Sequence, residues 1–92
     1  MSDARLVLRT RTALHGGVVE VVVWPVPEPA PPSLHGFKYR LVFAQAGERV
    51  VGYDNDRGKG DHKHLGALER PYPFSDLATL INDFLADVEA LR

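Results

Sequence analysis

The chain has 92 residues, a formal net charge of -1 and no cysteine. This length suits one domain, and a hydrophobic fraction of 45% excludes an intrinsically disordered protein. The near-zero charge excludes a global attraction to nucleic acid or anionic membrane, so any such binding needs a local patch. The absence of cysteine excludes disulfides and thiolate zinc sites. Because neither a signal peptide nor a membrane span is evident, we expect one cytoplasmic domain over residues 1–92.

Four segments have the composition and spacing of β-strands. Apolar and polar side chains alternate in Arg5–Arg11 and in Phe37–Phe43, which is typical of strands with two different faces. Val18–Trp24 is rich in β-branched residues, and Arg49–Tyr53 follows a turn at residues 45–48. These segments predict an antiparallel sheet of about four strands.

Residues 25–34 are rich in proline, because five of the eight residues from Pro25 to Pro32 are proline. Proline has no backbone N–H to donate to a sheet, so we expect an extended surface loop. The simpler interpretation is a spacer between two strands, and the alternative is a docking segment for a partner.

A C-terminal amphipathic helix is predicted over residues 75–91. Ser75 has a hydroxyl suited to the N-cap, and apolar residues then recur at helical spacing up to Leu91. We expect this apolar stripe to pack on one face of the sheet, which gives an α+β fold of the order β-β-β-β-α. The polar residues of the helix are expected to face water: Asn82, Asp83, Asp87 and Glu89.

Residues 54–66 form a charged, glycine-rich segment that we interpret as a functional loop at the end of a strand. The first interpretation is a solvated turn with internal ion pairs. The second is a metal site, because His62 and His64 point the same way in an extended segment, and Asp54 or Asp61 can add a carboxylate.

The third interpretation is a phosphodiester site. Arg57, Lys59 and Lys63 can hold phosphate, and a histidine can transfer a proton near neutral pH. Cleavage of RNA without a metal needs a base, a cation and an acid, and this segment contains candidates for all three. Two further histidines, His15 and His35, adjoin glycines and are expected to be solvated.

Basic residues also fall on one face of the predicted sheet. Lys38 and Arg40, with Arg9 from the first strand, are expected on the face away from the helix. This stripe is either an ordinary wet face or an RNA-binding face, to which Tyr53 can add stacking on a base.

Several stretches together resemble the TumE family, whose members are treated as the toxins of bacterial toxin–antitoxin pairs. The resemblance is strongest from His35 to Val88, and the stretches that carry it are His35–Leu41, Tyr53–His64, Pro71–Phe74 and Asp83–Val88. It implies a toxin neutralised by a separate antitoxin protein, and an analogy to RelE-like toxins suggests RNA cleavage. The positions that match the family are Tyr53, Asp54, Asn55, Arg57, Lys59, Asp61, His62 and His64.

We therefore predict a toxin that acts on RNA as an endoribonuclease without a metal or other cofactor. We expect an antitoxin and RNA as partners and no membrane, and a homodimer is compatible with the sheet edges. The alternatives are a non-catalytic binder and a metal-dependent enzyme. The predicted catalytic residues are Asp54, Arg57, Lys59, Asp61, His62 and His64. The predicted RNA contacts are Lys38, Arg40, Tyr53, Asn55 and Lys63.

Overall fold

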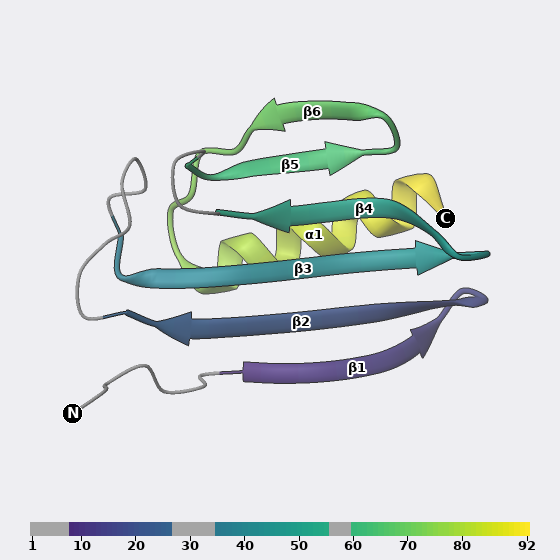
Figure 1. Cartoon of the computed structure of the whole chain (residues 1–92), viewed down its shortest axis with the longest axis horizontal. Coiled ribbons are helices and arrows are strands. Elements are labelled where there is room, and N and C mark those ends of the chain that lie inside the picture. The colour runs from purple at the N-terminus through teal and green to yellow at the C-terminus, as the bar shows by residue number, and fades with distance from the viewer. Residues whose placement is uncertain (1–7, 27–34, 56–59) are drawn as a thin grey trace.

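The computed structural model describes residues 8–26, 35–55 and 60–92. These residues form one antiparallel sheet in which each strand pairs with the next in sequence, and one helix that lies across one face of the sheet (Figure 1). The α+β class and the C-terminal helix are therefore confirmed. The elements are β1 (Leu8–Leu14), β2 (Gly17–Pro25), β3 (Phe37–Gln45), β4 (Glu48–Asp54), β5 (His62–Leu65), β6 (Leu68–Pro71) and α1 (Leu77–Leu91).

The sheet has six strands among the described residues, whereas the sequence predicted about four. Of the two additional strands, β5 lies in the segment over residues 54–66 that we interpreted as a loop, and β6 follows it in a segment for which we predicted no strand. Each strand has only four residues, and neither shows the alternation of apolar and polar residues that reveals a strand in a sequence. All four residues of β6 are exposed, so none of them needs to be apolar. The two strands pair as a hairpin closed by Leu65 and Leu68, with Gly66 at a φ of 61° in the turn.

Two other hairpin turns join consecutive strands, and the second lies at the predicted residues 45–48. The turn between β1 and β2 has positive φ at His15 (51°) and Gly16 (74°), and the turn between β3 and β4 has positive φ at Ala46 (52°) and Gly47 (75°). Two successive residues with positive φ give a turn whose twist matches the twist of the flanking strands. Both turns therefore fix the strand register.

The helix begins two residues later than predicted. Asp76, and not Ser75, is the N-cap, and its carboxylate accepts a hydrogen bond of 2.8 Å from the backbone N–H of Thr79. The buried side of α1 consists of Leu80, Phe84 and Val88. These side chains meet the alternate residues of β2, β3 and β4 that face the helix: Val19, Val21, Val23, Tyr39, Leu41, Phe43, Val51 and Tyr53.

Two acidic residues of α1 do not face water, so that part of the helix prediction is wrong. The hydroxyl of Tyr72 donates a hydrogen bond of 2.6 Å to Asp83, and the hydroxyl of Tyr53 donates one to Asp87. Both tyrosines are buried and need an acceptor for the hydroxyl, and an acid on the facing helix supplies it.

The opposite face of the sheet is covered by no other element in the described part of the chain (Figure 1). We call it the open face. The described residues also contain no helix that is long and apolar enough to cross a membrane.

Candidate active site on the open face of the sheet

The candidate residues near the end of β4 separate onto two sides of the sheet. In the register, Asp54 pairs with His62 and Gly52 pairs with His64, so Asp54 and both histidines share the open face. Tyr53 pairs with Lys63 on the helix side. The segment that the sequence presented as one loop is therefore mostly a strand pair with two different faces.

His62 is held by contacts at both ring nitrogens. Its side chain is buried, with 7% exposed, and its Nδ1 lies 3.0 Å from the carbonyl oxygen of Gly60. Because a carbonyl only accepts hydrogen bonds, Nδ1 carries a proton and donates it. Its Nε2 lies 2.5 Å from Oδ1 of Asp54. This arrangement fixes the ring and directs Nε2 toward the carboxylate.

Oδ1 of Asp54 is buried and receives no hydrogen bond from any described residue. Nε2 of His62 lies close to this oxygen without forming a hydrogen bond with it, and the pair is ionic only when the ring is protonated. A buried carboxylate oxygen without a hydrogen-bond donor is uncommon, and such oxygens are often found where a ligand binds or where a proton is transferred.

His64 is the second histidine of the cluster, and its ring centroid is 5.0 Å from that of His62. Burial is the main cause that lowers the pKa of His64 below its ordinary value, and the positive charge of Arg49 lowers it further. This shift favours the neutral form of His64. A neutral imidazole can accept a proton or bind a metal.

Arg49 and Glu69 also lie beside the two histidines, and neither was among the site residues predicted from the sequence. A Cβ on Gly52 would lie 2.9 Å from Cδ of Arg49, so the missing side chain of Gly52 leaves room for the arginine above β4. Oε2 of Glu69 lies 3.5 Å from Nε2 of His62 and 3.7 Å from Nε2 of His64. Glu69 comes from β6, a strand that the sequence did not reveal, and Arg49 meets His64 because β5 pairs with β4, which the sequence did not reveal either.

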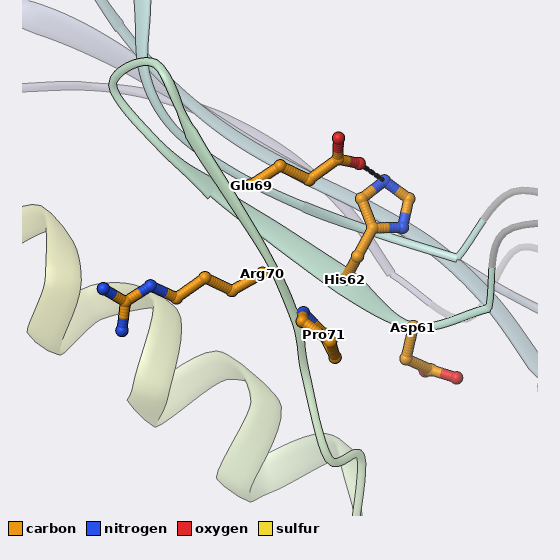
Figure 2. Close-up of a pocket in the computed structure, with 5 residues that line it drawn as sticks. All are labelled: Asp61, His62, Glu69, Arg70 and Pro71. Carbon is orange, nitrogen blue, oxygen red and sulfur yellow. Dashed lines mark ion pairs between the residues drawn. The ribbon is translucent and has the colours of Figure 1, made fainter.

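An open pocket of about 280 Å³ adjoins His62 at the β5–β6 edge of the sheet. Figure 2 shows Glu69 turned toward the His62 ring, whereas Arg70 extends to the other side, toward α1. The pocket gives small molecules in solvent a route to His62. Its lining consists of Asp61, His62, Glu69, Arg70 and Pro71.

Asp61 belongs to a different cluster. Its Oδ2 lies 2.6 Å from Nε2 of His35 and accepts a hydrogen bond of 2.8 Å from the hydroxyl of Tyr39. The His35 ring also stacks on Phe74, with centroids 3.8 Å apart. The prediction that His35 is solvated is therefore wrong, while His15 is exposed as expected and pairs with Glu89. Among the described contacts, Asp61 orients His35.

Three predicted RNA contacts point into the protein. Asn55 is 2% exposed; its Oδ1 accepts from the backbone N–H of Tyr39, and its Nδ2 donates to the carbonyl of Phe37. Tyr53 is 1% exposed, and Nζ of Lys63 lies 3.2 Å from Asp87. These side chains are bonded to the backbone of β3 or to the helix, away from the two histidines.

The predicted basic stripe is present on the open face. Lys38 and Arg40 are exposed, and Arg40 pairs in register with Asp54 of the histidine cluster. Arg40 lies 3.3 Å from Glu20. Arg9 and Arg40 pair with the same residue of β2 from its two sides, so both lie on the open face. Two predicted catalytic residues, Arg57 and Lys59, lie outside the described residues.

A family model described as toxin TumE matches residues 1–92, the whole chain. The chain belongs to the TumE toxin family. Membership confirms the resemblance seen in the sequence and is consistent with one half of a toxin–antitoxin pair. No curated protein and no solved structure matches the chain.

The open face of this TumE toxin can support two kinds of chemistry. Two imidazoles beside a carboxylate and basic residues can transfer protons at a phosphodiester. The ligand atoms of Asp54, His62 and His64 also lie within 4.8 Å of one another, which is a geometry that can hold a metal ion.

Proposed function

We propose that this toxin cleaves RNA as a metal-independent endoribonuclease, with its active site on the open face. The observation that carries the proposal is the convergence of Asp54, His62 and His64 at one end of a stripe of exposed basic residues. A chain without excess positive charge needs such a local stripe to bind a polyanion.

The two histidines take opposite roles in the proposed reaction. His64, whose lowered pKa favours the neutral ring, accepts the proton of the ribose 2′-hydroxyl, whose oxygen then attacks the adjacent phosphorus. His62, when protonated at Nε2, gives that proton to the departing 5′-oxygen as the P–O bond breaks. The products are a 2′,3′-cyclic phosphate and a 5′-hydroxyl. Asp54 positions the His62 ring through its contact with Nε2.

The basic residues stabilise the charge that develops on the phosphate oxygens. Arg40 stands beside Asp54 in the register, and Arg49 acts directly on His64. Lys38 extends the same face and holds the RNA backbone, without reading its sequence. Arg57 and Lys59 remain proposed phosphate contacts. The proposal places the toxin in the cytoplasm, where an antitoxin protein neutralises it.

The test is incubation of the purified toxin with total RNA in the presence of a chelator. We expect cleavage that leaves cyclic phosphate ends, and a loss of at least about 100-fold in rate for His64→Ala. His15→Ala is the matched control, because it removes a histidine that lies outside the cluster and pairs with Glu89. Intact RNA with a folded, toxic protein overturns the proposal in favour of a non-catalytic binder. Loss of cleavage in the chelator alone overturns metal independence.

A further inference from the structure

We infer that Asp54, His62 and His64, with Glu69 as a fourth ligand, form a binding site for a divalent transition-metal ion such as Zn²⁺. The first three residues each offer one ligand atom, and these atoms lie within 4.8 Å of one another. Tetrahedral zinc keeps neighbouring ligand atoms about 3–4 Å apart, so a small rotation of the side chains closes the set.

The hydrogen bond of His62 to the backbone supports this inference. Nδ1 donates to the carbonyl of Gly60, which leaves Nε2 as the nitrogen with a lone pair. Histidines that bind metals commonly donate their other ring N–H to a carbonyl or carboxylate, because this bond fixes the ring and its tautomer. His62 is also buried, so its ring orientation is set before a ligand arrives.

The second observation is the buried Oδ1 of Asp54, which has no donor among the described residues. It lies 2.5 Å from Nε2 of His62, and no hydrogen bond joins the two atoms. When Nε2 carries no proton, its lone pair and the negative oxygen repel each other at this separation unless another positive charge lies near both. An ion bound by both atoms supplies that charge and provides the partner that Oδ1 lacks.

The donor set selects the class of metal. Two imidazole nitrogens with one or two carboxylate oxygens suit zinc and its transition-metal neighbours, whereas Mg²⁺ and Ca²⁺ prefer sites made of oxygen. Glu69 is within reach, because its Oε2 is 3.5 Å and 3.7 Å from the two Nε2 atoms. Arg40 and Arg49 oppose a cation, but the two carboxylates offset their charge locally. The pocket beside His62 and Glu69 gives the ion an entry path (Figure 2).

The inference has a regulatory consequence that rests on the proposed function. A bound ion occupies the lone pairs of both imidazoles, so neither ring can take up or release a proton at those nitrogens. Metal binding and proton transfer then exclude each other at one site, and zinc inhibits RNA cleavage.

The binding test uses metal-free protein titrated calorimetrically with ZnCl₂, with no RNA present. We expect one ion per chain, and at a hundredfold excess of zinc over Kd the unfolding midpoint rises by at least about 10 °C. Co²⁺ serves as a spectroscopic probe, and it should give the intense visible bands of a tetrahedral ion. MgCl₂ should produce no comparable heat or shift.

The variants locate the ion. His64→Ala and Asp54→Asn should each weaken zinc binding by at least about 100-fold, with circular dichroism showing that both variants are folded. His15→Ala should bind zinc as the parent does. Absence of zinc binding, or equal binding by His64→Ala, overturns the site. Because this readout needs no RNA, a toxin that binds zinc but leaves RNA intact fails the proposed function alone, and zinc-stimulated cleavage overturns the inhibitory consequence.

Discussion

The hydroxyl of Tyr53 in β4 donates a hydrogen bond to the carboxylate of Asp87 in α1. Nζ of Lys63 in β5 lies 3.2 Å from the same carboxylate. Asp87 therefore connects the helix to two strands of the sheet, one turn away from the bond between Tyr72 and Asp83. The acidic side of the helix thus fixes its position over the sheet.

Replacing Asp87 by alanine should destabilise the fold. The change leaves the buried hydroxyl of Tyr53 without this acceptor and Lys63 without this counter-charge, at a cost of about 1–3 kcal/mol. Unfolding in urea measures the difference. Asn82→Ala, on the exposed side of the same helix, is the control and should change stability little. Equal stability of the two variants would show that the Asp87 contacts contribute nothing.

The three tyrosines should ionise only in strong alkali. Burial is the main cause that raises the pKa of Tyr39, Tyr53 and Tyr72 above the ordinary value of 10.0, and their carboxylate partners raise it further. Because the pKa of each tyrosine is higher in the folded state than in the unfolded state, the neutral tyrosines stabilise the fold fully below pH 10. The free energy of unfolding then falls as the pH rises beyond 10. The ultraviolet absorbance of tyrosinate should therefore appear together with alkaline unfolding. Ionisation of a folded protein near pH 10 contradicts this account.

Truncation of Phe84 should test the core between helix and sheet. Phe84 is 0% exposed and meets the ring of Tyr53 edge to face, with centroids 5.7 Å apart. Phe84→Ala should cost about 3–5 kcal/mol, which approaches the whole stability of so small a domain. Thermal unfolding measures it, and Leu85→Ala, at a side chain that is 39% exposed, should lower the midpoint far less.

The side chain of Asn55 should stabilise β3. Its amide bonds the backbone of Phe37 and Tyr39, so Asn55→Ala leaves two strand groups without these partners and should cost about 1–3 kcal/mol. Hydrogen exchange should show faster exchange at the amide of Tyr39 than in the parent. Unchanged protection there, together with a loss of RNA binding, would instead support a direct contact of Asn55 with RNA.

The sequence was sufficient to predict the parts of the fold with strong periodicity. Alternation in Phe37–Phe43 and helical spacing up to Leu91 predicted β3 and α1, and the glycine turns placed the hairpins. The hairpin of β5 and β6 was not predicted, because the eight residues of its strands are mostly polar and its turn has a single glycine, Gly66. Pairing with β4, and not local pattern, holds β5 in the sheet.

The same limit applies to the site. The spacing of His62 and His64 was sufficient to predict that both rings point the same way, and the structure places both on the open face. Arg49 and Glu69 become their neighbours because β5 pairs with β4 and with β6, and the sequence did not reveal these two pairings. Asp61 and the histidines are near in sequence, yet Asp61 contacts His35 because Tyr39 and Phe74 hold that ring beside it.

The toxicity should depend on the open-face cluster of Asp54, His62 and His64. Growth arrest after induced expression, without antitoxin and at matched protein levels, tests it most directly. We expect arrest by the parent and by His15→Ala, and normal growth with His64→Ala. Full arrest by a folded His64→Ala protein would contradict the claim.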